Sequence, residues 1–488
     1  MARTPSSGAH ASGSRGTPAR FLTGSIMRHV TVMALTGTVG IVAVFAVDLL
    51  NFFYISRLGE KPIAAAVGFA GAIGFFQISI GIGLTIGIGA AVSVAIGRAV
   101  REAGPGDAPR IATTSLIAMM AITLAVGLAT AAARNPLLDL LHAEGETKQL
   151  AAMYLLITSP ALPLMIMGMG CGALLRSAGA ARQAMNVTLY GAVAVAAMDP
   201  IFIFALHLRL EGAAISTVLS RAFMAGLGLY YLRRQGLLGR PDFTRARADL
   251  GEVSRVAIPA ILTNLATPVG SAYVTHTMAQ FGVAAVAGQA AIDRIMPVAF
   301  GVLFALTGAV GPIMAQNLGA GRADRVRETL RASLIFMVVA VVLAWGVLAS
   351  VQDLLALAFS SKGVAAALLH LYCSWISGAA VFLGALFVAN AAFNNLGRAG
   401  YATFLNWGRA TLGTIPFVHV GAHFGPQGVV IGQAAGSVVF GAAAILLAFR
   451  VVNRLHHEQL GRVPMPIIAV PGGRNTVMPL DLDEAGRD

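Results

Sequence analysis

Two aspartates stand inside long apolar segments of the chain, where an ionised side chain is unfavourable. Asp48 lies in the segment that follows Arg28, and Asp199 lies in a later segment that follows Arg182. A helix rises about 1.5 Å per residue, which places the carboxylates roughly 30 Å and roughly 25 Å along their helices. At these similar depths the two side chains could share one pocket. Acids within membrane spans are functional candidates, because an unpartnered charge is expensive there.

The chemistry available to such a pair is reversible protonation. Two carboxylates in a partly desolvated pocket oppose each other's charge, so one would hold a proton near neutral pH and the pair would titrate as a unit. The alternative for Asp48 is a structural acid that is hydrogen-bonded to Asn51 or to a neighbouring helix. The alternative for Asp199 is a structural acid at the helix break that Pro200 introduces.

A third charged spot lies in the second half of the chain. Asp293 and Arg294 stand about 16 Å along an apolar segment that begins near Gly282. Asp293 either faces a central cavity and attracts cationic substrates, with Gln289 one turn earlier on the same face, or belongs to an interhelical network. The tentative cavity residues are Asp293, Gln289, Asn264 and Met165. For the methionine, packing is the alternative.

The composition indicates an α-helical membrane protein with many spans. Of 488 residues, 57% are hydrophobic and only 11% are charged, which is too little charge for a soluble protein of this length. The net charge of +13 does not indicate nucleic-acid binding, because the arginines gather in short loops between apolar runs. Cys171 and Cys373 are isolated, which argues against a disulfide or a zinc site.

Apolar runs of about 20 residues predict twelve membrane-spanning helices in two sets of six. The first six lie near 28–54, 62–97, 111–133, 150–175, 184–206 and 212–232. The second six lie near 253–280, 284–316, 328–350, 364–392, 401–421 and 427–450. Glycines recur in both sets: Gly59 and Gly282 are 223 positions apart, and Gly179 and Gly397 are 218 apart. We therefore expect two parallel repeats around a central site.

The loops on one side of the predicted spans carry most of the basic residues, so this side is predicted to be cytoplasmic. These residues include Arg98, Arg101, Arg176, Arg182, Arg233, Arg234, Arg322 and Arg325. We expect a disordered tail over 1–27, a lobe over 28–232, a linker over 233–252, a second lobe over 253–450 and a tail over 451–488. We expect both tails in the cytoplasm and a monomeric protein in the inner (plasma) membrane.

Several short motifs follow one another across the twelve spans. They are Val47-Asp48, Arg57-Leu58-Gly59, Leu175-Arg176-Ser177-Ala178-Gly179, Met198-Asp199-Pro200, Ile258-Pro259-Ala260, Gln316-Asn317-Leu318-Gly319-Ala320 and Asn395-Leu396-Gly397-Arg398-Ala399-Gly400. In their order and spacing, the chain between Met27 and Arg450 resembles the multidrug and toxic compound extrusion (MATE) transporters. The resemblance implies two six-helix lobes around a central cavity. It also implies export of amphipathic, often cationic compounds in exchange for H+ or Na+.

Within that family the two aspartates resemble the DNA-damage-inducible subgroup, which couples through its first lobe. In that subgroup the acids share a site with a tyrosine and a threonine, and Tyr154 and Thr217 match those positions. The subgroup often has an asparagine one turn before the second acid, whereas Val195 stands here. Losing that oxygen weakens a Na+ cage, so we expect H+ as the coupling ion, with Na+ as the alternative.

Two other functions stay open from the sequence. A lipid-linked oligosaccharide flippase of the same superfamily usually has more arginines facing its cavity and additional spans, neither of which is evident. A membrane-embedded enzyme would need a metal-ligand cluster or a Ser/His/Asp set within the spans, and we find neither. We therefore expect a transporter with no catalytic residues and no cofactor beyond the coupling ion. Its partners are the lipid bilayer and small amphipathic or cationic substrates.

Overall fold

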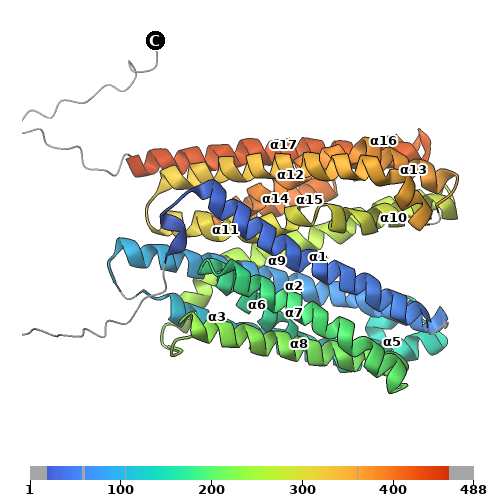
Figure 1. Ribbon diagram of the computed structural model, residues 1–488, viewed down its shortest axis with the longest axis horizontal. Coiled ribbons are helices and arrows are strands. Elements are labelled where there is room, and N and C mark those ends of the chain that lie inside the picture. Colours follow the sequence, from blue (N-terminus) through green and yellow to red (C-terminus); the bar gives the residue numbers. More distant parts are fainter. Residues whose placement is uncertain (1–18, 58–60, 105, 360, 461–488) are drawn as a thin grey trace, which may run out of the picture.

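The computed structural model describes residues 19–57, 61–104, 106–359 and 361–460, and these residues form helices but no strand (Figure 1). A 3-10 turn, η1 (Arg20–Leu22), precedes the first long helix. The first half contains α1 (Ile26–Arg57), α2 (Lys61–Arg101), α3 (Ala108–Ala132), α4 (Arg134–Leu140), α5 (Gly145–Thr158), α6 (Leu162–Ser177), α7 (Ala181–Pro200), the π-helical turn η2 (Ile201–Ala205) and α8 (Arg209–Arg234).

The second half repeats this plan with more breaks. It contains α9 (Ala246–Ala279), α10 (Val283–Ala299), α11 (Gly301–Gly319), α12 (Ala323–Ala358), α13 (Val364–Ser374), the 3-10 turn η3 (Ile376–Ala379), α14 (Ala380–Asn395), α15 (Ala399–Ala410), α16 (Ile415–Ala422) and α17 (Gly425–Leu460). The two halves form two lobes that lie side by side along the long axis (Figure 1).

Ten of the described helices are long and apolar enough to cross a membrane, and the bent pair α5–α6 makes an eleventh span. The predicted span at 401–421 is divided into α15 and α16, which have 12 and 8 residues. Each piece is shorter than the roughly 20 residues that a single helix needs to cross the hydrocarbon core. The all-helical membrane fold with two six-span lobes, predicted from the sequence, is confirmed.

Other predicted spans are also broken, and prolines stand at the breaks. The fourth bends by 53° between α5 and α6, and Pro163 occupies the first turn of α6, where no backbone N–H is needed. The eighth breaks at Phe300, three residues after Pro297, whose ring removes a backbone hydrogen bond. The second span, its counterpart in the first lobe, has a proline only at its start and stays one helix, α2.

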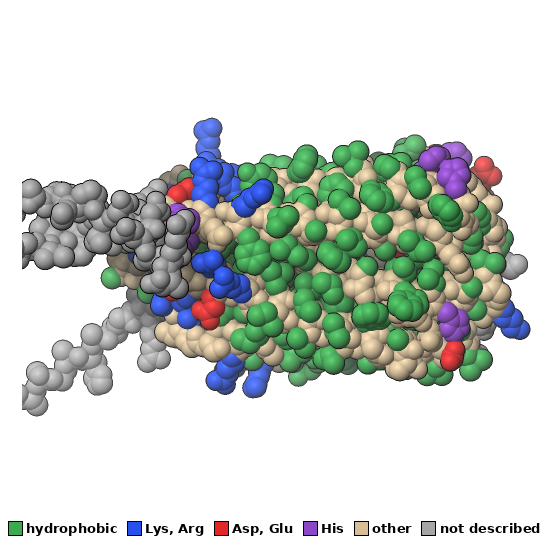
Figure 2. All heavy atoms as spheres, turned by 90° about the horizontal axis from the view of Figure 1, so that it is seen from above, with side chains coloured by type: hydrophobic (Ala, Val, Ile, Leu, Met, Phe, Trp, Pro, Cys, Tyr) green, Lys and Arg blue, Asp and Glu red, His purple; other side chains and the backbone are tan. Residues whose placement is uncertain are grey.

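Basic side chains gather at one end of the molecule, whereas hydrophobic side chains cover the middle of the face that Figure 2 shows. We call this the basic end. Helices α2 and α8 finish there with Arg98, Arg101, Arg233 and Arg234 in their last turns, and α9 and α12 begin there. This separation of charge along the long axis is the pattern of a protein whose middle is embedded in lipid.

Glycines bring the two lobes into backbone contact near the basic end. A methyl group at Gly97 of α2 would overlap the carbonyl oxygen of Gln316 in α11, and one at Gly319 would overlap that of Val94. Further along α2, a methyl group at Gly87 would lie 2.7 Å from the Val253 carbonyl oxygen of α9. Larger residues at these positions would hold the lobes apart.

The segment before α1 joins both lobes at the basic end. Phe21 is only 2% exposed, and its N–H donates to Gln316 Oε1 at 3.2 Å. Gln316 Nε2 donates in turn to the Ser177 carbonyl of the first lobe at 2.6 Å. Arg325 of α12 donates to the Phe21 carbonyl at 3.0 Å. The predicted tail over 1–27 therefore ends in an ordered segment, while residues 1–18 and 461–488 lie outside the described part.

We expect Gly97→Ala to destabilise the protein by about 1–3 kcal/mol, because the added methyl group has only rigid backbone to displace. The measurement is thermal unfolding of the purified protein in detergent. Gly68→Ala in the same helix is the matched control, since a Cβ there meets nothing within 4 Å. Equal unfolding temperatures for the two variants would contradict this account of the lobe contact.

Candidate functional site

The predicted acid Asp199 is buried among α1, α7 and α8. Its Oδ2 accepts a hydrogen bond from Asn51 Nδ2 at 2.7 Å, and its Oδ1 accepts one from the Ser216 hydroxyl. The residue is 0% exposed. A carboxylate can be kept this far from water only where donors replace its hydration. Three helices therefore meet at one acid.

The register of α1 against α7 places Asn51 beside Asp199. Helices α1 and α7 run in the same direction away from the basic end (Figure 1). They approach closely at Gly40, where a Cβ would lie 3.3 Å from that of Thr188. Asn51 and Asp199 each stand eleven residues beyond this contact. Eleven residues are about three helical turns, so the two faces that meet at Gly40 meet again at the acid.

The third helix, α8, reaches the acid through a second close approach. Pro200 lacks an N–H, and the chain after it forms the π turn η2. A Cβ at Gly212 of α8 would lie 2.5 Å from the Phe202 carbonyl oxygen of that turn. Ser216 stands one turn further along α8, and this position brings its hydroxyl to Asp199.

Asp48 occupies a different environment from Asp199. It is an exposed residue, yet protein surrounds its carboxylate closely enough to desolvate it. It therefore does not belong to the sealed core that holds Asp199. Asn51, three residues later on α1, is directed to Asp199. The sequence alternative in which Asn51 serves Asp48 is thus not what the structure has.

The remaining two predicted site residues lie beside these acids. The Tyr154 side chain of α5 lies beside the Thr217 side chain of α8. Thr217 also donates to the Ala213 carbonyl of its own helix at 2.8 Å. Tyr154 is within electrostatic range of both Asp199 and Asp48. The fold therefore gathers the four residues from four helices into one cluster.

Sequence reasoning missed a cation in this cluster. Arg221 of α8 donates to the Thr158 carbonyl at the end of α5, at 3.2 Å, and interacts electrostatically with Tyr154. It stands one turn after Thr217, so one face of α8 carries both side chains towards α5. A lone arginine within an apolar run meets the same criterion that selected Asp48. It was detectable in the sequence.

Two more arginines lie within helices of the membrane region. Arg176, assigned to a loop from the sequence, lies inside α6, and Arg409 lies inside α15. Both side chains are deeply surrounded by protein. The interior therefore carries positive as well as negative groups.

In the second lobe, the predicted pair Gln289 and Asp293 is joined on α10. Gln289 Nε2 donates to Asp293 Oδ1 at 2.9 Å. Tyr372 of α13 lies within electrostatic range of Asp293. Tyr154 and Tyr372 are 218 positions apart, the same offset as Gly179 and Gly397. Each lobe thus places a tyrosine at the equivalent position of the repeat, within electrostatic range of an aspartate.

Among the described residues, the last two candidate cavity residues form no hydrogen bond with a member of these clusters. Asn264 donates to the Ala260 carbonyl of its own helix at 2.8 Å. Met165 is partly buried and packs against the hydrophobic core of the first lobe. In the structure Met165 has a packing role, which is the alternative that the sequence offered for it.

A family model, MatE, matches residues 38–201 and 259–419, which is most of the membrane region in both lobes. The chain belongs to the MatE family. This membership confirms the resemblance seen in the sequence motifs and the expectation of a transporter and not an enzyme. The two matched ranges correspond to the two repeats.

Curated relatives of this MatE protein have different cargoes in their names. A FAD transporter of Shewanella oneidensis is 29% identical over 442 residues, covering 88% of this chain and 96% of the relative. The multidrug export protein MepA of Staphylococcus aureus is 22% identical over 312 residues, covering 63% of this chain and 67% of MepA. The family therefore includes relatives for cargoes of differing chemistry.

Solved structures share the fold. The MATE transporter VcmN of Vibrio cholerae superimposes with a TM-score of 0.83 at 24% identity, covering 88% of this chain and 98% of VcmN. A multidrug resistance MATE transporter described as outward-facing gives a TM-score of 0.84 at 20% identity, covering 91% and 99%. These likenesses concern the fold alone.

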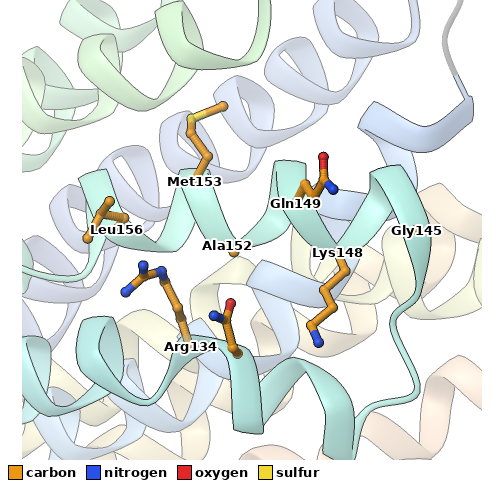
Figure 3. A pocket seen from close by; sticks show the side chains of 8 residues that line it. Arg134, Gly145, Lys148, Gln149, Ala152, Met153 and Leu156 are labelled. Carbon is orange, nitrogen blue, oxygen red and sulfur yellow. The ribbon is translucent and has the colours of Figure 1, made fainter.

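A hollow at the end opposite the basic end does not coincide with the predicted site. It has a volume of about 610 Å³, and Arg134, Lys148 and Met153 are among the residues that line it. The side chains of Arg134 and Lys148 point into the space between α4 and α5 (Figure 3). Lys148 already pairs with Asp139 at 2.5 Å. None of the predicted site residues lines this hollow.

We expect Asn51→Ala to destabilise the folded protein by about 1.5–3 kcal/mol, because it removes a hydrogen bond to a buried charged group. The measurement is thermal unfolding in detergent at neutral pH. Thr38→Ala is the matched control on α1, because the Thr38 hydroxyl bonds only to the Ala34 carbonyl of its own helix. Equal stability of the two variants would contradict the role assigned to Asn51.

Proposed function

We propose that this MatE protein is a secondary active antiporter that exports amphipathic, often cationic small molecules in exchange for H+. Asp48 and Asp199 are the proton-binding groups, and Tyr154 and Thr217 complete their site. The observation that carries the proposal is the first-lobe cluster, in which a sealed carboxylate and an accessible one flank the same tyrosine. Coupling needs an acid that reaches solvent and a partner that responds to its charge.

In the proposed cycle, the accessible Asp48 takes a proton when the cavity faces the outer side. Loss of its charge changes the electrostatic balance at Tyr154 and Asp199, and α1 repacks against α7. Substrate leaves outward, the lobes rock, and the proton is released to the cytoplasm. The basic end is the cytoplasmic end in this proposal, supported by the gathering of arginines there. The lobe contacts at that end support an outward-facing state.

The available driving force is sufficient for concentrative export. One unit of pH difference is worth about 1.4 kcal/mol per proton. A membrane potential of about 100 mV adds about 2.3 kcal/mol per charge. Together they support a substrate concentration ratio of roughly several hundredfold per proton.

The choice of H+ over Na+ now rests on Arg221. The sequence argument used the absence of an amide at Val195, but Asn51 supplies an amide to Asp199 from α1. Arg221 places a fixed positive charge beside Tyr154, within the same cluster as both acids. A tethered cation repels a bound Na+, whereas a proton neutralises one carboxylate without needing a ligand cage.

A second candidate cargo is a flavin dinucleotide, after the FAD transporter of Shewanella oneidensis. The observation that favours it is the presence of Arg176 and Arg409 inside the membrane region. Phosphate groups are the natural partners of buried guanidinium groups. Recognition of a cationic cargo would depend instead on Asp293 and Gln289, which lie together in the second lobe.

We expect Asp48→Asn and Asp199→Asn each to abolish efflux driven by a pH gradient, because neither amide can gain or lose a proton. The measurement is efflux of a cationic dye, and in parallel of a flavin, from proteoliposomes with an imposed gradient. Asp353→Asn is the control, since that exposed acid lies at the far end of α12. Undiminished proton-driven efflux in Asp48→Asn would contradict the proposal.

We expect Arg221→Gln to make transport responsive to Na+, because the fixed charge that excludes Na+ is gone. The same proteoliposomes are assayed with a Na+ gradient at constant pH, where the unaltered protein should show no response. Arg221→Lys keeps the charge and should behave like the unaltered protein. If Arg221→Gln stays insensitive to Na+, Arg221 does not set the ion selectivity.

A further inference from the structure

We infer that Arg176, together with three phenylalanines at the lobe interface, forms a binding subsite for the anionic group of an amphipathic organic substrate. The inference rests on the proposed export function and names the chemical class that one part of the cavity accepts. A phosphate or carboxylate binds Arg176, and the attached ring system lies on the aromatic side chains. We call these four residues, Arg176, Phe45, Phe304 and Phe387, the anion subsite.

Arg176 reaches across the interface between the lobes. It belongs to α6 of the first lobe, and its Nε would lie 3.1 Å from a Cβ built on Gly308 of α11 in the second lobe. One terminal nitrogen turns back along α6 to within 3.5 Å of the Cβ position of Gly172. The two glycines leave the space that the guanidinium fills. Any larger residue at Gly308 would displace it.

The Arg176 guanidinium has no partner among the described residues. None of them forms a hydrogen bond, an ion pair or a ring contact with it. Its nitrogens are not completely buried, so they open onto accessible space inside the protein. A guanidinium within a membrane protein must meet water, a polar group or an anion, because lipid cannot solvate it. Unpaired and open, it is a site for an anion.

Arg409 is a second arginine inside the membrane region, in the second lobe. Its Nε is completely buried and has no hydrogen-bond partner in the described part of the chain. Arg409 lies ten residues from the start of α15 at the basic end, which is about 15 Å along the helix. Gly308 lies eleven residues from the end of α11 at the basic end, or about 16 Å. The two cations thus stand at similar depth, Arg176 at the interface between the lobes and Arg409 in α15 of the second lobe.

The aromatic part of the subsite lies one turn beyond Arg176. Phe304 precedes Gly308 by four residues, so the two share a face of α11. Its ring centroid is 6.3 Å from that of Phe45 in α1 and 5.3 Å from that of Phe387 in α14. All three rings remain partly exposed. They form an apolar wall, drawn from both lobes, on which a planar ring can stack.

The subsite is distinct from the coupling acids in depth. Asp48 stands 22 residues after the start of α1, which is about 33 Å from the basic end. The Arg176 guanidinium beside Gly308 is only about half as deep. An anion at Arg176 is therefore separated from the carboxylate charge of Asp48, and the two sites can be occupied independently.

Two sources could supply the anion: a free organic molecule or the headgroup of an anionic lipid. The geometry favours the free molecule, because the aromatic wall is built by side chains of both lobes where α1, α11 and α14 meet. Guanidinium groups bind phosphate and carboxylate with paired hydrogen bonds, and planar rings suit phenylalanine faces. The subsite therefore fits an aromatic ring system that carries phosphate or carboxylate.

The test compares flavin mononucleotide with riboflavin, which differ only by the phosphate. Full-length protein is placed in nanodiscs of phosphatidylcholine, and flavin fluorescence is titrated without any ion gradient. We expect flavin mononucleotide to bind about tenfold more tightly than riboflavin, a difference of about 1.4 kcal/mol. Because no gradient is present, failure of proton coupling leaves this measurement unaffected.

The variants separate the two parts of the subsite. Arg176→Gln should remove the preference for the phosphate and leave riboflavin binding unchanged, and Arg176→Lys should restore part of it. Phe304→Ala should weaken both flavins alike and serves as the second variant if Arg176→Gln does not fold. Arg454→Gln is the control, because Arg454 is exposed and pairs with Glu458 near the end of α17.

Three results would overturn the inference. One is equal affinity of the unaltered protein for the two flavins. Another is an unchanged phosphate preference in Arg176→Gln. The third comes from nanodiscs that contain phosphatidylglycerol: loss of the preference there would assign Arg176 to a lipid headgroup. An unchanged preference in those nanodiscs supports a free organic anion.

Discussion

The hydrogen bond between Asn51 and Asp199 is the interaction on which the first lobe depends. A carboxylate with no exposed surface is tolerated only because donors from α1 and α8 replace its water. The position of those donors follows from close backbone contacts at Gly40 and Gly212, several residues away. Any change that moves α1 relative to α7 therefore changes the environment of the acid. In the proposed function, this mechanical link lets a proton influence the position of a helix.

The charges inside the molecule are distributed by depth. The acids of the first lobe, with Arg221 and Tyr154, stand far from the basic end, whereas the Arg176 guanidinium stands nearer to it. Each of these groups needs water or a hydrogen-bond partner, since lipid supplies neither. In the proposed function, ion coupling and substrate charge recognition therefore occupy different levels of one cavity. The levels of ion coupling and of substrate charge recognition are connected through the interface between the lobes.

Glycine and proline positions decide how the two repeats differ. The second span stays one helix, while its counterpart breaks next to Pro297. The glycines of α2 and α11 let backbones touch near the basic end, and the segment around Phe21 covers that contact. The lobes are consequently joined at one end. Opening there must break the Gln316 hydrogen bonds to Phe21 and Ser177.

The sequence by itself determined the fold class and the family, and it singled out most of the residues proposed for coupling. Long apolar runs can only be membrane helices, and an acid within one is conspicuous, as Asp48 and Asp199 were. Arg221 was equally visible in the sequence, because a lone charge in an apolar run stands out without a structure. The motif order was sufficient to indicate the MATE family.

The tertiary structure alone decided which side chains are partners. From the sequence, Asn51 was one alternative partner for Asp48, yet it donates to Asp199, because the register of α1 and α7 sets its direction. Arg176 was assigned to a loop, yet it lies inside α6 and reaches the other lobe, because Gly308 leaves room for it. Helical periodicity fixes the face on which a residue lies, whereas only packing between distant segments fixes what that face meets.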